Sequence, residues 1–163
     1  MEIKDNVLTK EQLKAIQDTY LNDQGVPMYY VGSVATLEDN KLGNYYHVHN
    51  IYEYPLGWLS NTHKVIFPIL KYLNTKALIK IKVNFYPRTD KIITHAPHSD
   101  QPFKCKSALF FVNSNDGFTY LVKEKEKVKS IENRVLHFNS FYKHNSSTCT
   151  NRNLRCTINF NYF

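Results

Sequence analysis

The sequence contains no apolar run near the length of about eighteen residues that a membrane-spanning helix needs. Its first residues, MEIKDNVLTK, also lack the basic and then apolar order that is typical of a signal peptide. Cysteine is scarce, since Cys105, Cys149 and Cys156 are an odd set that makes no disulfide framework and no C-x-x-C pair. We therefore expect a cytoplasmic protein with reduced, partly buried cysteines and no membrane partner.

What is abundant is aromatic and β-forming residues. Aromatics make up 14% of the 163 residues, with twelve Tyr and ten Phe. This length closes one hydrophobic core but not two, so we expect a single domain over 1–163, with helical support over roughly 8–75 and core strands over roughly 77–163. No internal repeat, linker or low-complexity segment interrupts it.

The formal net charge of +7 makes nucleic acid a candidate partner. The lysines, however, are spread along the chain, and the densest stretch, KEKEKVK at 123–129, includes glutamates and is typical of an exposed hairpin. A solvated basic surface is therefore the favoured interpretation, with nucleic acid binding as the alternative.

Two helices are predicted in the first part of the chain. In LTKEQLKAIQDTYLND (8–23), Thr9 is an N-cap with Gln12 three residues later, which is a capping-box pattern. In NTHKVIFPILKYLNTK (61–76), apolar residues form one stripe, and Pro68 marks a kink or an early-turn position. Between them, 25–58 has no clear period and predicts irregular strands and loops.

From residue 77 onward the period becomes two, which is typical of strands with two different faces. ALIKIKVNFYP (77–87) and LRCTINFNYF (154–163) alternate apolar with polar residues. KSALFFVN and GFTYLVK, separated by the turn SND, predict a hairpin, and NRVLHFN (133–139) predicts a further strand. Short successive strands indicate an antiparallel sandwich or barrel of the mainly β (α+β) class.

The segment THAPHSDQP (94–102) offers a metal-binding pattern. On an extended segment His98 and Asp100 project from one side, so both could reach one ion. His144, in the turn YKHNSS before the last strand, is the candidate third ligand. Two histidines and one aspartate leave three positions of the ion open, as in non-haem Fe(II) oxygenases.

Two further residues suggest a ligand beside that metal. Arg155 lies on the polar face of the last predicted strand, and its guanidinium would project into the same cavity. A fixed cation inside a sheet needs an anionic partner, for which a carboxylate is well suited. Tyr86 can offer that carboxylate a hydroxyl. The pattern therefore favours a small dicarboxylate that chelates the metal at its other end.

From about residue 78 to the end, the chain resembles the 2-oxoglutarate- and Fe(II)-dependent oxygenases, in particular the prolyl-4-hydroxylase-like branch and its small marine bacteriophage members. The resemblance lies in NFYPRTDKIITHAPHSD, in CKSALFFVNSNDGFTYL, and in the distal histidine and basic residue of NRVLHFNSFYKHNSSTCTNRNLRCTINFNYF. It implies a double-stranded β-helix (a jelly-roll or cupin-like fold) with supporting N-terminal helices.

The resemblance also implies roles for single residues. His98, Asp100 and His144 would bind Fe(II), while Arg155 and Tyr86 would bind 2-oxoglutarate, with Arg152 as the rival of Arg155. Where related prolyl hydroxylases often have a tyrosine on the hairpin strand, this chain has Phe110-Phe111, so Tyr86, Thr157 or a water must supply that contact.

The implied activity is that of a dioxygenase that uses Fe(II), 2-oxoglutarate and O2, with ascorbate as a candidate reductant, and that releases succinate and CO2. Peptidyl-proline is the substrate that the resemblance favours; small molecules and nucleobases stay open, as does the oligomeric state. A phage-encoded protein would work in the host cytoplasm. The alternatives are a zinc hydrolase, which accepts the same ligands but leaves Arg155 and Tyr86 without a task, and a non-catalytic jelly-roll binding module.

Overall fold

The structure is a computed structural model that describes residues 1–22 and 25–163. The predicted helical segment 8–23 therefore ends outside the described residues. No helix in the described part of the chain is both long and apolar enough to cross a membrane.

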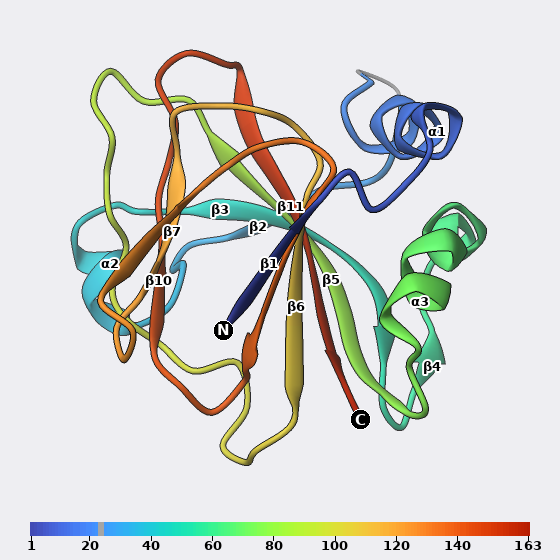
Figure 1. Cartoon of the computed structure of the whole chain (residues 1–163). Helices are drawn as coiled ribbons and strands as arrows, with labels where there is room; N and C mark the ends of the chain where they lie inside the picture. Colours follow the sequence, from blue (N-terminus) through green and yellow to red (C-terminus); the bar gives the residue numbers. More distant parts are fainter. Residues whose placement is uncertain (23–24) are drawn as a thin grey trace.

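Two antiparallel sheets form the centre of the molecule (Figure 1). Among the described residues, the large sheet has the strand order β1-β9-β6-β11-β5-β3-β2, with β4 paired to β3, and the small sheet has the order β10-β7-β8. The strands are β1 (Glu2–Asp5), β2 (Tyr29–Val31), β3 (Tyr46–Glu53), β4 (Gly57–Trp58), β5 (Leu78–Pro87), β6 (Lys106–Phe111), β7 (Phe118–Leu121), β8 (Glu126–Lys129), β9 (Arg134–Asn139), β10 (His144–Ser146) and β11 (Leu154–Tyr162). The predicted mainly β class is confirmed.

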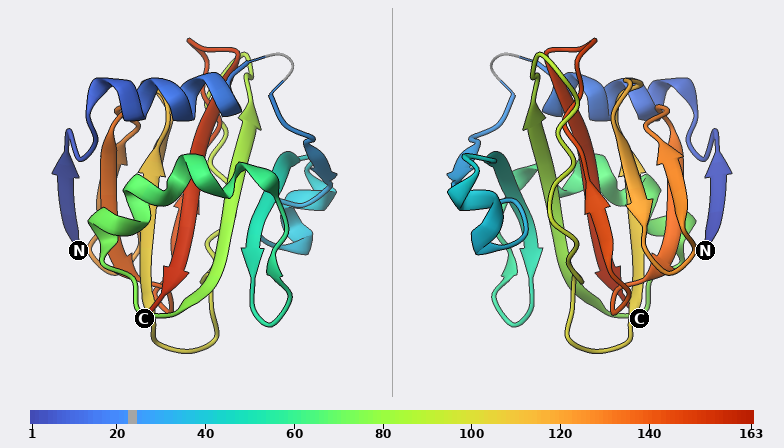
Figure 2. Two further views of the ribbon diagram at one scale, coloured as in Figure 1. Left: turned by 90° about the vertical axis from the view of Figure 1, so that its right-hand side faces the viewer. Right: turned by 90° about the vertical axis from the view of Figure 1, so that its left-hand side faces the viewer.

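α1 and α3 cover one face of the large sheet, and the small sheet covers the other face (Figures 1 and 2). The helices are α1 (Lys10–Tyr20), α2 (Leu37–Lys41), the 3-10 helix η1 (Asn61–Ile66) and α3 (Phe67–Leu73). α1 and α3 lie across the sheet, whereas α2 lies at its β2–β3 edge, opposite the edge formed by β1 (Figure 2). The face between the two sheets is therefore free to form a cavity.

The two predicted helices form for the expected local reasons. The Thr9 side chain accepts from the Gln12 backbone N–H, and the Gln12 side chain accepts from the Thr9 N–H, so the capping box is confirmed. The second helix is divided, because η1 precedes α3, and Pro68 takes the first turn of α3, where no backbone donor is required. Their apolar stripes pack on β5 and β11 in one core, which includes Ile16, Tyr20, Ile66, Ile69, Ile81, Phe85, Cys156, Ile158 and Phe160.

Two predictions about strands are wrong. Segments 106–113 and 117–123 do not pair as a hairpin: β6 pairs with β11 and β9 in the large sheet, while β7 pairs with β8 and β10 in the small one. The intervening turn thus carries the chain from one sheet to the other. The partners of β6 and β7 are distant in the sequence, and the local pattern does not reveal them. Residues 25–58 are also more regular than predicted, because β3 is an eight-residue strand between β5 and β2.

The predicted exposed hairpin at 123–129 is confirmed. β7 and β8 pair around a turn in which Lys125 takes a positive φ of 55°. The three cysteines are free and buried, as expected.

Candidate metal centre

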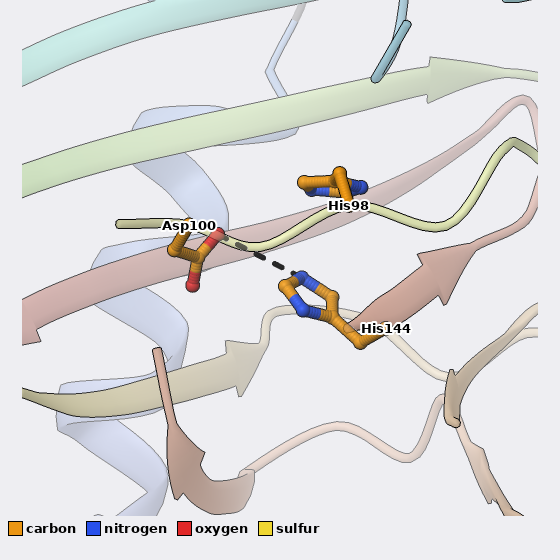
Figure 3. A group of neighbouring side chains, drawn as sticks. All are labelled: His98, Asp100 and His144. Atoms are coloured by element: carbon orange, nitrogen blue, oxygen red, sulfur yellow. Dashed lines mark ion pairs between the residues drawn. The ribbon is translucent and has the colours of Figure 1, made fainter. Parts of the chain in front are cut away.

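Three side chains meet between the sheets: His98 and Asp100 from the segment that follows β5, and His144 from the start of β10 (Figure 3). The backbones at 98 and 144 form an isolated antiparallel bridge, with the His98 N–H donating to the His144 carbonyl (3.0 Å) and the reverse bond at 2.9 Å. One ligand atom from each side chain lies within 4.8 Å of the others. The structure thus brings together the three residues singled out in the sequence, and their role as metal ligands stays a prediction.

Asp100 is held by three neutral donors. Its side chain is only 8% exposed and accepts hydrogen bonds from Ser107 Oγ (2.6 Å), Asn159 Nδ2 (3.0 Å) and Asn161 Nδ2 (3.2 Å). Burial would raise the pKa of Asp100, but His144, Ser107, His98 and Asn159 together hold it below its usual value. The carboxylate is therefore charged and fixed in orientation near neutral pH.

Sequence reasoning missed these three supporting residues. The signal was present, because Asn159 and Asn161 alternate with apolar residues on the last strand. Ser107 pairs with Asn161 across β6 and β11, which places all three on the face of the large sheet toward the cavity. The alternation of polar and apolar residues does not show that the Asp100 carboxylate is the group that accepts from these side chains.

The two histidines lie beside the Asp100 carboxylate. Burial, and then the neighbouring His144, lowers the pKa of His98 to about 4, so its imidazole is uncharged at neutral pH. Its Nδ1 is buried and has no hydrogen-bond partner among residues 1–22 and 25–163. His144 Nε2 lies 3.7 Å from Asp100 Oδ1, which is the ion pair drawn in Figure 3. A buried imidazole nitrogen without a partner beside a fixed carboxylate is suited to a metal ion, since neutral imidazole and carboxylate are ligands of Fe(II) and Zn(II) alike.

Arg155 is fully buried on β11, and none of the described carboxylates pairs with it. Its guanidinium donates to Ser130 Oγ (2.8 Å), Thr119 Oγ1 (2.8 Å) and the Ser147 carbonyl (3.4 Å). Burial lowers the pKa of Arg155, yet a guanidinium keeps its proton at neutral pH. The arrangement is a fixed, buried positive charge with no carboxylate partner in the part of the chain that the structure describes.

The close packing around Arg155 depends on a glycine. A Cβ at Gly117 would lie 2.7 Å from Arg155 Cδ and 2.6 Å from the Thr148 carbonyl oxygen. Any larger residue at this position would therefore displace the Arg155 side chain.

Tyr86 lies beside Arg155, as the alternation predicted. The two residues are register partners on β5 and β11, and the Arg155 Cζ is 5.1 Å from the centre of the Tyr86 ring. The ring stacks on Tyr46 at 5.5 Å and on His95 at 5.4 Å. Burial raises the pKa of Tyr86, so its hydroxyl stays protonated and can donate.

His95 lines neither of the two chambers at the site. It is 2% exposed, and its Nδ1 hydrogen-bonds Ser146 Oγ at 2.9 Å. Burial lowers its pKa to about 4, so it is a neutral packing residue behind Tyr86. Arg152, the rival of Arg155, is exposed and donates to the Ser114 carbonyl, away from these residues.

Two connected chambers surround the metal-ligand candidates. The inner chamber, of about 20 Å³, is lined by His98, Asp100 and His144 together with Tyr46, Lys82, Tyr86, Thr119 and Arg155. The outer chamber, of about 160 Å³, shares Val34, Lys82, His98, Asp100 and Asn159 with it and adds Ala35, Lys80, Ser99 and Asn161. The segment 25–58 thus contributes Val34 and Ala35 to the mouth of the site.

No protein-family model and no curated protein matches the chain. Among solved structures, an oxidoreductase of the 2-oxoglutarate-Fe(II) oxygenase family from Burkholderia pseudomallei is similar over 97% of this chain and 81% of its own, at 12% identity and a TM-score of 0.68. The chain has the fold of these oxygenases.

Prolyl hydroxylases are similar to a comparable degree. The viral collagen prolyl hydroxylase of Paramecium bursaria Chlorella virus-1, solved with 2-oxoglutarate, covers 98% of this chain and 93% of its own, at 12% identity and a TM-score of 0.64. A Trichoplax adhaerens prolyl hydroxylase, solved with a peptide fragment of the hypoxia inducible factor oxygen degradation domain, covers 99% and 82%, at 16% identity and a TM-score of 0.64. These similarities confirm the predicted jelly-roll fold of the prolyl-4-hydroxylase-like type, whereas the resemblance to bacteriophage members stays a prediction.

Proposed function

We propose that the protein is a non-haem Fe(II)- and 2-oxoglutarate-dependent dioxygenase that hydroxylates its substrate and releases succinate and CO2. The observation that supports this most strongly is the buried, anion-free Arg155, which shares a cavity with His98, Asp100 and His144. A metal site alone does not require that cation. A diacid that binds the metal at one end and Arg155 at the other uses all four residues.

The chain's own residues fit Fe(II). His98, Asp100 and His144 would hold it, with the partnerless His98 Nδ1 marking a nitrogen that no protein donor satisfies. Ser107, Asn159 and Asn161 fix the carboxylate, as outer-shell hydrogen bonds do at metal sites. Bound iron would supply the activation of O2 and the oxidative decarboxylation of 2-oxoglutarate.

The role proposed for Arg155 and Tyr86 is to bind the far carboxylate of 2-oxoglutarate. Ser130 and Thr119 hold the guanidinium in one orientation, so little side-chain entropy is lost when an anion arrives. The inner chamber has room for about one water molecule. The cosubstrate must therefore displace lining side chains as it enters.

Phe111 takes the place where related enzymes often have a tyrosine, and it faces Arg155, with the guanidinium 5.8 Å from its ring centre. The missing hydroxyl contact would fall to Tyr86, to a water or to Thr157, which pairs with Phe111 across β6 and β11. A zinc hydrolase would use the same three ligands but would leave Arg155 without an anion.

A prolyl residue of a peptide is the substrate we propose, because a structurally similar prolyl hydroxylase is known with a bound peptide. O2 is the second cosubstrate, with ascorbate as the proposed reductant, and a cytoplasmic location stays a prediction.

The experiment that tests the function is an anaerobic titration with Fe(II) and 2-oxoglutarate. A weak visible charge-transfer band that requires both is expected, followed on admission of O2 by conversion of 2-oxoglutarate to succinate. His98→Ala should abolish both signals. A wild-type protein that stays colourless, forms no succinate and hydrolyses model esters with Zn(II) would overturn the proposal.

A further inference from the structure

The inner face of β5 and β11 is a ladder of polar pairs that runs outward from Arg155. From the buried end to the mouth, the register partners are Tyr86 with Arg155, Asn84 with Thr157, Lys82 with Asn159, and Lys80 with Asn161. Strands rise about 3.3 Å per residue, so the lysines lie well outside the inner end of the cavity, at the level where Asn159 and Asn161 hold Asp100. Lysine is an unusual choice for a face that lines a cavity.

The two lysines differ in their partners. Lys80 Nζ forms an ion pair with Glu53 at 2.9 Å. Lys82 has no ion pair with a described carboxylate; its Nζ donates to the Tyr46 hydroxyl at 3.1 Å and lies 5.3 Å from that ring's centre. It is half-buried and lines both chambers, so its charge is directed at the site.

The formal charges of the side chains that line the two chambers, together with Glu53 as the partner of Lys80, sum to +1. In the metal-free protein, Arg155 and Lys82 face the single negative charge of Asp100, and the pair formed by Lys80 and Glu53 is neutral. Adding Fe(II) and the dianion 2-oxoglutarate changes the total by zero. Both the empty and the loaded site therefore favour an additional anion.

A separate groove lies next to the outer chamber. It shares Ser99 with the outer chamber, has a volume of about 430 Å³, and is lined by Gln101, Pro102, Val122, Lys123, Phe141, Tyr142 and Lys143. Phe141 is 46% exposed, and none of the described residues that line the groove is acidic. The groove has an apolar floor and two lysines, Lys143 and Lys123, the latter with its Nζ 3.8 Å from the centre of the Tyr142 ring, and it lies next to the cavity at Ser99. Such a groove suits an extended chain that is partly apolar and partly acidic.

We propose that the substrate is an acidic peptide segment, which lies in this Ser99 groove and places a carboxylate against Lys82 next to the residue that reacts. The inference deepens the proposed function and rests on it. Lys82 is then the residue that determines specificity, while Phe141 provides affinity without regard to charge.

The test is fluorescence anisotropy with labelled short peptides that differ only in the residue before a central proline, which is Asp, Asn or Lys. The wild-type protein should bind the Asp peptide about tenfold more tightly than its Asn counterpart, the effect of one charge-assisted hydrogen bond. Lys82→Gln should reduce this ratio to about one, and Lys82→Arg should restore most of it. Phe141→Ser should weaken both peptides equally and leave the ratio unchanged.

Lys80→Gln is the matched control, because Lys80 lies on the same face but already has Glu53 as its partner. If it removes the preference as completely as Lys82→Gln does, or if Lys82→Gln leaves the preference intact, the assignment to Lys82 is overturned. Two outcomes would overturn the peptide assignment. In the first, N-acetyl-aspartate binds as tightly as the Asp peptide. In the second, a single-stranded oligonucleotide displaces the labelled Asp peptide at a lower concentration than the unlabelled peptide does.

Measuring the metal-free protein separates this inference from the proposed function. If the protein shows no visible charge-transfer band with Fe(II) and 2-oxoglutarate but still prefers the Asp peptide in a Lys82-dependent way, only the proposed dioxygenase activity is refuted. A protein that gives the band but binds Asp and Asn peptides equally refutes the acidic-peptide substrate alone.

Discussion

Replacing Arg155 by methionine should separate ligand binding from folding. Methionine has a similar length, and Phe111 and Tyr86 beside it offer apolar surface. Removing a buried charge that has no acidic partner in the described chain is expected to leave the stability of the ligand-free protein unchanged or higher. The 2-oxoglutarate carboxylate, by contrast, would be left unpaired in the chamber, at a cost of about 3 kcal/mol, which raises Kd roughly a hundredfold.

The assay is thermal or chemical unfolding with and without 2-oxoglutarate, in the presence of a redox-inert divalent metal. At a ligand concentration of about 100 times the wild-type Kd, the wild-type protein gains about 2.7 kcal/mol, whereas Arg155→Met gains about 0.4 kcal/mol. Arg152→Met is the matched control and should behave as wild type, because Arg152 is exposed and directed elsewhere. If Arg155→Met is unfolded without ligand, Arg155 is needed for folding and the reasoning is refuted. If Arg155→Met keeps the wild-type ligand effect, Arg155 does not bind the carboxylate and the reasoning is refuted as well.

Three further predictions concern the support of the site. Asn161→Ala removes a donor to Asp100 and should lower Fe(II) affinity about 10- to 100-fold in a metal titration; an unchanged affinity would contradict the support role. Gly117→Ala should weaken 2-oxoglutarate binding and lower the unfolding free energy by about 1–3 kcal/mol, because the new Cβ meets both Arg155 and a backbone carbonyl. Since His95 has a pKa of about 4 when folded and about 6.5 when unfolded, the unfolded state binds the proton first, and His95 should contribute a loss of up to about 3 kcal/mol between pH 6.5 and 4 in the metal-free protein, in addition to the similar loss from His98. His95→Gln should flatten that part of the stability curve, and an unaltered slope would exclude His95 as its source.

The sequence predicted those features that depend on local pattern. The capping box of α1, the early-turn position of Pro68 and the two-faced strand β11 all follow from spacing over a few residues. The candidate ligands could also be found, because His98 and Asp100 are two residues apart on an extended segment. Arg155 was distinguished from Arg152 by its place in the alternation, and the structure buries the former and exposes the latter.

What the sequence did not predict depends on long-range pairing. Nothing local indicates that β6 and β7 belong to different sheets, since each has the composition of a hairpin strand. β3 was missed because its buried residues do not alternate: Tyr46 and Val48 are buried, His49 and Ile51 are buried as well, and the register shifts between Asn50 and Tyr52. The sequence did not single out Lys82, because its significance depends on the absence of a carboxylate partner among the described residues, which no spacing can show.

The central claim is that His98, Asp100 and His144 hold one metal ion and that Arg155 binds the far end of the cosubstrate. The most direct measurement is a crystal structure of the protein with Mn(II) and 2-oxoglutarate, in which anomalous scattering locates the metal. We predict a single peak bonded to all three side chains, with the distal carboxylate of 2-oxoglutarate paired to Arg155. A peak at any other position, or a carboxylate that binds without contacting Arg155, would contradict the account.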